Sequence, residues 1–211
     1  MQSSLSRPQR GFTLVEALVI LAVLAIAMAL GAPALHRMIV RSSLEATGSE
    51  MAVLFQRARL EAIKRRVPTV VEVDPSTGTV RAFADVDGPA ATDPPDLLFN
   101  PVAGELRFDT DYEIGVVRAG SRVRFAAPAG QPVADGLTEA DGERVAVFLP
   151  TGGVDRPGGF RVGDEAGWNH LEVRVEPAGT GRIALRKWDR DRGEWYAHRE
   201  GGRPWIWYSG P

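Results

Sequence analysis

The sequence predicts an α+β fold, in which a long N-terminal helix precedes a head of mostly antiparallel β-sheet. Three observations predict it. Residues 12–35 are almost continuously apolar, and apolar residues continue at helical spacing to residue 62. From residue 67 onward the pattern changes to short β-type runs separated by turns, without a second long helical pattern. The length of 211 residues allows one ordinary domain, or a domain with an appendage.

Composition excludes several classes of protein. The chain is 44% hydrophobic and 25% charged, which is a globular composition and not a collagen-like or disordered one. The absence of cysteine excludes disulfide frameworks, thiol catalysis, cysteine–zinc sites and iron–sulfur clusters. A formal net charge of -2 offers no overall attraction to nucleic acid.

The apolar segment 12–35 contains a single ionisable residue, Glu16. As a helix it would span about 36 Å, enough to cross a bilayer core of roughly 30 Å. A soluble core helix rarely stays apolar on every face over this length, so the segment is predicted to span a membrane. Arg7 and Arg10 precede it and predict a cytoplasmic N-terminus, with the head outside the cytoplasm.

Three roles fit such a segment. It is a plain membrane anchor, a secretory signal cut after Ala34, or a prepilin signal that is cut before the apolar run and retained. Ala32-Pro33-Ala34 has the small–x–small form of a secretory cleavage site. A charge within the segment is costly to insert, however, and neither an anchor nor a disposable signal requires Glu16.

Residues 10–16, Arg-Gly-Phe-Thr-Leu-Val-Glu, resemble the type IV prepilin signal at every defined position. The resemblance implies that prepilin peptidase cuts between Gly11 and Phe12, so that residues 1–11 are a removed leader. It also implies that Phe12 becomes the N-methylated N-terminus.

Glu16 would then lie one helical turn from the new amine of Phe12. An amine–carboxylate pair in an apolar setting offsets the desolvation of both charges and fixes the register between packed helices. Glu16 is therefore predicted to be an assembly residue. The alternative is a solvated carboxylate near the membrane interface.

The helix is predicted to continue through an amphipathic half, residues 36–66, after a transmembrane half, residues 12–35. Met51, Phe55, Ala58 and Ala62 form its apolar stripe. Gly31 and Pro33 are expected to bend or locally melt it. Basic residues 64–66 and then Pro68 predict its end.

Residues 67–211 are predicted to form the β-rich periplasmic head. A turn at 75–78 predicts a hairpin between the first two strands. Loops rich in Pro, Gly, Ala and Asp are predicted at 85–101 and 127–142. The predicted strands are 69–74, 79–84, 105–108, 112–117, 122–126, 144–149, 160–162, 171–175 and 183–188.

Three short segments of the head resemble the GspH/FimT family of minor pilins and pseudopilins. They are 84–88 (Ala-Asp-Val-Asp-Gly), 148–153 (Phe-Leu-Pro-Thr-Gly-Gly) and 173–185 with its Gly-Thr-Gly-Arg-Ile run. The resemblance implies a pilin-like fold, in which the long helix packs on the β-sheet head, and a structural role in a filament.

DNA-binding members of this family carry a Gly-Arg-x-Arg signature in the last region. Here the matching run is Gly-Arg-Ile-Ala at 181–184, so the second arginine is missing, although Arg186 follows two residues later. Arg182 and Arg186 remain the candidate nucleic-acid contacts, but the departure disfavours nucleic acid as a partner and favours the secretion branch of the family.

The C-terminal region holds all five tryptophans: Trp168, Trp188, Trp195, Trp205 and Trp207. We expect them to cap the core or to form a final hairpin, with an interaction surface as the alternative.

No motif predicts an enzyme, a cofactor or a metal site. His36, His170 and His198 lack metal-ligand spacing, and the Asp-Val-Asp-Gly run at 85–88 lacks the later ligands of a calcium loop. No nucleophile elbow, phosphate-binding loop or dinucleotide fingerprint is present.

The expected function is that of a minor pseudopilin, a subunit of the type II secretion pseudopilus that takes part in protein secretion. Its expected partners are prepilin peptidase, other pseudopilins or pilins through the N-terminal helix, and the inner membrane, which it crosses once before entering the filament. The alternative is a minor pilin of a type IV pilus, acting in pilus assembly, adhesion or DNA uptake. A third class is a membrane-tethered periplasmic enzyme or receptor.

Overall fold

The structure is a computed structural model that describes residues 14–84, 112–140, 143–198 and 202–208. It divides into two compact units that join between Ile39 and Val40. Gly11, Phe12, the predicted strand 105–108 and the predicted loop 85–101 lie outside the described residues.

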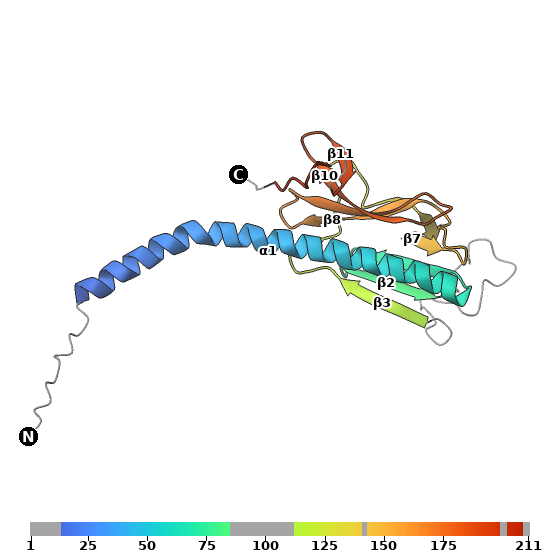
Figure 1. Ribbon diagram of the computed structural model, residues 1–211, viewed down its shortest axis with the longest axis horizontal. Coiled ribbons are helices and arrows are strands. Elements are labelled where there is room, and N and C mark those ends of the chain that lie inside the picture. Colours follow the sequence, from blue (N-terminus) through green and yellow to red (C-terminus); the bar gives the residue numbers. More distant parts are fainter. Residues whose placement is uncertain (1–13, 85–111, 141–142, 199–201, 209–211) are drawn as a thin grey trace, which may run out of the picture. The chain divides into compact units, whose positions relative to one another are not determined.

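One helix, α1 (Leu14–Arg65), contributes to both units (Figure 1). It continues through Gly31 and Pro33 without interruption, so it is not locally melted there, and the expected bend stays a prediction. Glu61 forms i,i+3 and i,i+4 ion pairs with Lys64 and Arg65 in the last turn. Arg66 then takes a positive φ of 61°, which ends the helix where the sequence predicts it.

From Val40 onward the helix packs in the head along its predicted stripe. Met51, Phe55, Ala58 and Ala62 are fully buried, as is Leu44 one heptad before Met51. This repeat of three and four residues places one face of the helix in the core.

The first sheet is antiparallel, with the strand order β3-β2-β1-β7-β6. The predicted hairpin is confirmed at its predicted bounds: Asp74 accepts hydrogen bonds from Ser76 and Thr77 in the turn, and Gly78 has a positive φ of 69°. The strands are β1 (Thr69–Asp74), β2 (Thr79–Ala84), β3 (Tyr112–Arg118), β6 (Thr138–Ala140) and β7 (Glu143–Phe148).

The second sheet has the order β11-β10-β9-β8-β4, with β5 also paired to β8. All of its pairings are antiparallel. The strands are β4 (Val123–Arg124), β5 (Ala134–Gly136), β8 (Gly158–Asp164), β9 (His170–Val175), β10 (Ile183–Asp189) and β11 (Glu194–Ala197).

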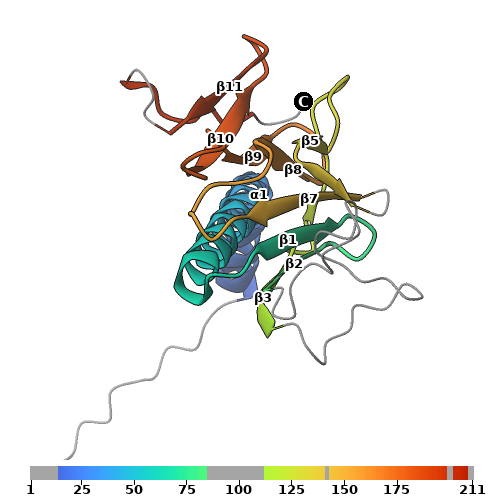
Figure 2. The same cartoon turned by 90° about the vertical axis from the view of Figure 1, so that its right-hand side faces the viewer.

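Phe55 joins the helix to both sheets. Its ring makes edge contacts with Phe148 of β7 in the first sheet, at 6.2 Å between centroids, and with Phe160 of β8 in the second, at 5.9 Å. Figure 2 looks at the head from the end of the helix and shows the two sheets on different sides of it. The core of the head therefore lies between α1 and both sheets.

Some predictions for the head are wrong. Residues 127–142 are not one loop, because they contain β5 and β6, each only three residues long. The predicted strand 122–126 is reduced to β4. The final hairpin is confirmed as β10–β11, in which Trp188 and Trp195 pair at 5.3 Å, while Trp205 and Trp207 pack against the core.

Phe55→Ala should destabilise the head by about 3–5 kcal/mol, because it removes a buried ring shared by three layers and leaves a cavity. The free energy of unfolding is measured by denaturant titration of the full chain in detergent micelles. Tryptophan fluorescence reports only the head, since all five tryptophans lie there. Val53→Ala, at a half-exposed position of the same helix, should change it by less than about 0.5 kcal/mol. Equal losses in the two variants would contradict this account of the core.

Candidate assembly site

The first unit presents an uncovered apolar surface. Within α1 the most hydrophobic window has a mean hydropathy of 2.6 and none of it is buried by the described chain. This is long enough and apolar enough to cross a membrane. Its exposed large side chains are Leu14, Val15, Leu18, Val19, Ile20, Leu21, Val23, Leu24, Ile26, Met28, Leu35, Met38 and Ile39. Such a surface requires cover from lipid or from other helices, and it fits membrane anchoring.

Glu16 lies in the first turn of α1, surrounded in sequence by these apolar residues. A carboxylate is electrostatically favoured there, because the N-terminal end of a helix carries partial positive charge. Its predicted partner, the amine of Phe12, lies outside the described residues. The pairing of Glu16 with that amine therefore stays a prediction.

The second unit fixes its part of the helix to the sheets by polar contacts as well as by the core. Thr69 Oγ1 donates to the carbonyl oxygen of Ala58 at 2.9 Å, and Arg59 Nε donates to that of Gly152 at 2.8 Å. Gly152 has a positive φ of 83°, and a Cβ atom there would lie only 2.9 Å from the Ile63 side chain. These contacts pack the turn after β7 against the helix.

The structure separates the roles of the two candidate nucleic-acid contacts. Arg182 is exposed just before β10. Arg186, within β10, forms an ion pair with Glu176, whose other carboxylate oxygen accepts a 2.7 Å hydrogen bond from Arg174 Nε. Arg186 is thus paired with an acid within the head, whereas Arg182 is exposed.

Arg186 and Glu176 belong to a larger ionic network on the second sheet. The side chains of Arg161 and Glu172 are almost fully buried and pair at 2.9 Å across β8 and β9. Asp135 of β5 accepts from both Arg161 and Arg174 at 3.2 Å. Three arginines therefore face three carboxylates, which leaves this network without net charge. Alternating charges along 172–176 are its only signal in the sequence, because its other members come from distant strands.

The pKa of the Glu176 carboxyl is lowered. Burial raises it, but the hydrogen bond from Arg174 and the charge of Arg186 together outweigh burial. The charged form of Glu176 consequently stabilises the fold.

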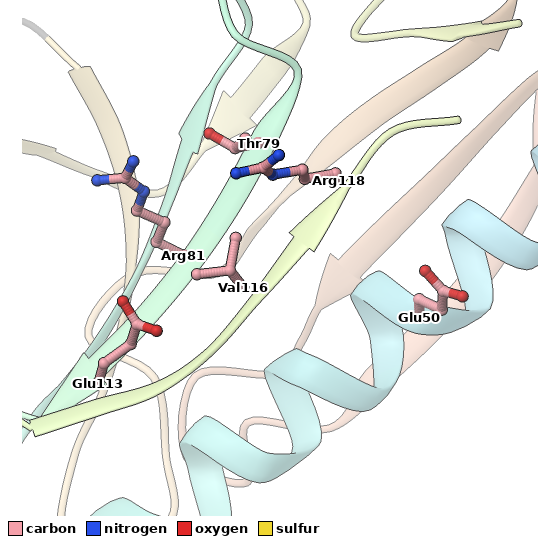
Figure 3. Close-up of a pocket in the computed structure, with 6 residues that line it drawn as sticks. All are labelled: Glu50, Thr79, Arg81, Glu113, Val116 and Arg118. Carbon is pink, nitrogen blue, oxygen red and sulfur yellow. The ribbon is translucent and has the colours of Figure 1, made fainter. Parts of the chain in front are cut away.

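A surface hollow of about 760 Å³ lies beside β2, β3 and α1 (Figure 3). Its lining mixes acids with arginines and does not bring together a nucleophile and a base. Its residues are Glu50, Thr79, Arg81, Glu113, Val116 and Arg118. Among the residues that the structure describes, no group of three or more His, Asp or Glu side chains could hold a metal ion. Residues 85–88 lie outside that part of the chain.

Glu176→Gln should lower the free energy of unfolding by about 1–2 kcal/mol at pH 7. Because the native pKa of Glu176 lies below its ordinary value of 4.5, its contribution is complete above that value and is lost as the pH falls through the native pKa. The difference between wild type and variant should therefore shrink at pH 3, as measured by denaturant titration. The control, Glu139→Gln in an exposed pair with Arg144, should change little at either pH. A difference for Glu176→Gln that grows at low pH would contradict this reasoning.

Two family models match parts of the chain. Residues 6–32 match the prokaryotic N-terminal methylation motif, and residues 47–181 match the family model of the type II transport protein GspH. No curated protein matches the chain significantly.

Two solved structures resemble the chain. The minor pseudopilin EpsH from the type 2 secretion system of Vibrio cholerae is 10% identical, with a TM-score of 0.44, over 67% of this chain and 95% of that one. The type IV minor pilin FimU of Pseudomonas aeruginosa is 13% identical, with a TM-score of 0.40, over 69% and 89%. The GspH model covers well over half of the sequence. The match includes the C-terminal part of α1, from residue 47, and strands β1 to β9. The chain therefore belongs to the GspH family of type IV pilin-like proteins and carries the N-methylation motif of such proteins.

Proposed function

We propose that the chain is a minor pseudopilin, a structural subunit of the pseudopilus of a type II secretion system. The observation that carries the proposal is the match of residues 47–181 to the type II transport family, on the same chain as an N-terminal methylation motif. The methylation motif supports processing by prepilin peptidase and assembly with other pilin-like subunits.

In the proposed maturation, prepilin peptidase cuts between Gly11 and Phe12 and the new amine of Phe12 is methylated. The apolar half of the helix holds the chain in the inner membrane. Arg7 and Arg10 favour retention of the N-terminus in the cytoplasm, which directs the head into the periplasm.

In the proposed assembly step, the apolar side chains of residues 14–39 exchange lipid for the helices of neighbouring subunits. Glu16 pairs with the amine of Phe12 in its own or in a neighbouring chain and so sets the register between helices. This pairing is favoured because a lone charge in an apolar environment is costly, whereas a paired one is less so.

The pilus alternative assigns the chain to a type IV pilus, with DNA uptake or adhesion as its task. The ion pair of Arg186 with Glu176 supports the secretion branch, since it removes one of the two cations that a DNA contact would use.

Deletion of the gene should cause substrates of the type II system to accumulate in the periplasm, with normal pilus assembly and DNA uptake. Fractionation and immunoblotting measure the first effect, and pilus shearing and transformation assays measure the second. Loss of pili with normal secretion would overturn the secretion assignment in favour of the pilus.

The intact mass of the membrane-extracted protein should correspond to a chain that begins at methylated Phe12. A chain beginning at Met1 or Leu35 would contradict the processing step.

Glu16→Ala should be cleaved normally but incorporated poorly, because the peptidase acts before Phe12 whereas the pairing acts between packed helices. Sheared filaments and membranes are compared by immunoblot, and a reduction of about a hundredfold or more in the filament fraction corresponds to removing one partner of a buried pair. Glu50→Ala, an exposed acid on the same helix within the head, is the matched control and should incorporate normally. Normal incorporation of Glu16→Ala would refute the pairing.

A further inference from the structure

Lys187 is one of only two lysines in the chain, and it is fully buried in β10. Its Nζ donates to Asn169 Oδ1 at 3.1 Å and lies 4.8 Å from the centre of the Trp207 ring and 5.2 Å from that of Tyr208. The amine is therefore shielded from water in a partly aromatic site. A lysine in such a site is costly to keep charged.

Burial lowers the pKa of Lys187 to about 8, against the opposing effect of the Asp164 and Asp189 carboxylates, while the charge of Arg41 lowers it further. A neutral amine is consequently present in useful amounts near neutral pH. Neutral amines are nucleophiles, whereas ammonium groups are not.

The side chain of Asn169 is held by four hydrogen bonds. Its Oδ1 accepts from Lys187 Nζ and from the backbone N–H of Tyr208 at 2.9 Å. Its Nδ2 donates to Asp164 Oδ2 at 2.7 Å and to the carbonyl oxygen of Tyr208 at 2.9 Å. The carboxamide is thus fixed in place. Its oxygen accepts two hydrogen bonds, and its nitrogen donates one to a carboxylate.

Asp164 is itself held in position and is almost fully buried. It accepts hydrogen bonds from the backbone N–H groups of Trp168, at 2.8 Å, and Asn169, at 3.1 Å. Its Oδ2 touches the nitrogen that would leave if the carboxamide were attacked. A carboxylate in this place can carry a proton from an attacking amine to a leaving amide nitrogen.

We propose that Lys187 and Asn169 join in an intramolecular isopeptide bond. The neutral Nζ of Lys187 moves from Oδ1 to the carbonyl carbon, Cγ, and forms a new C–N bond. The oxyanion that develops on Oδ1 remains hydrogen-bonded to the N–H of Tyr208. Asp164 takes one proton from Nζ and passes it to Nδ2, the old C–N bond breaks, and ammonia leaves. An amine and a carboxamide become a secondary amide and ammonia, so no oxidant or other reactant is needed.

The reaction is assisted chiefly by placement. Amine and carboxamide are already at hydrogen-bond distance, with Nζ 3.1 Å from Oδ1, and productive attack requires an approach of roughly 3–3.5 Å between Nζ and Cγ. The two side chains come from β10 and from the residue before β9, which are adjacent strands of the second sheet. The bond would join β10 to the turn before β9. It would lie beside residues 202–208, since Tyr208 is hydrogen-bonded to Asn169. β10 lies beyond the end of the GspH match at residue 181.

The intact mass of the full-length chain in detergent micelles tests the proposal, after incubation at pH 9 to deprotonate Lys187. The wild type should be lighter than its sequence by one ammonia molecule, and proteolysis should give a branched peptide that joins Lys187 to Asn169. Lys187→Arg and Asn169→Ala should keep their full masses. The matched control is Lys64→Arg at the other lysine, which is exposed in the last turn of α1, and it should still lose ammonia.

Three results would overturn the proposal. The first is a wild-type chain of full mass whose tryptophan fluorescence shows a folded head. The second is loss of water in place of ammonia, which would assign the bond to Asp164 or Asp189. The third is ammonia loss that persists in Lys187→Arg, which would indicate cyclisation of an asparagine on its own backbone. The mass of the folded wild-type chain is sufficient to overturn the proposal, even if one of the variants fails to fold.

Discussion

An apolar helix must have its side chains covered, and in this chain one continuous helix meets that requirement in two different ways. From Val40 onward, α1 places its stripe beneath two antiparallel sheets, with Phe55 in contact with a ring from each. Between Leu14 and Ile39 the described chain supplies no such cover, and large side chains are exposed throughout. In the head, the apolar stripe of α1 is covered by the head's own sheets, whereas the apolar side chains of the first half of the helix are suited to contact with lipid or with other helices. Membership of a pilin-like family agrees with this division.

The second sheet contributes a different kind of stability. Its charged network joins Arg161, Arg174 and Arg186 to Asp135, Glu172 and Glu176, so each of these arginines is paired with an acid within the head. The opposite arrangement surrounds Lys187, which is buried without a direct carboxylate hydrogen bond among those that the structure describes and meets a carboxamide and two aromatic rings. Paired charges hold the sheet together, whereas the Lys187 amine is buried beside a carboxamide and aromatic rings.

The sequence predicted those features that depend on local pattern. The β1–β2 hairpin is found at its predicted bounds because its turn chemistry is local, and the stripe from Met51 to Ala62 is buried because helical spacing is unambiguous over several turns. Strands of three residues, such as β5 and β6, carry no usable periodicity and were missed. The environment of Lys187 is not predictable from local sequence pattern, because the contact of Asn169 with Tyr208 joins positions far apart in sequence. The motif around Glu16 was recognisable, but the partner of Glu16 lies outside the described residues.

Cysteine accessibility measures the division of α1 most directly, because the natural chain has no cysteine. Single variants Leu21→Cys, Met51→Cys and Val53→Cys are reconstituted in lipid vesicles and exposed to a water-soluble maleimide. We expect Val53→Cys to react, Met51→Cys to be protected by the head, and Leu21→Cys to be protected by lipid but to react once the vesicles are dissolved in detergent with denaturant. Labelling of Leu21→Cys in intact vesicles as fast as that of Val53→Cys would contradict the claim that the two halves of one helix are covered by different means.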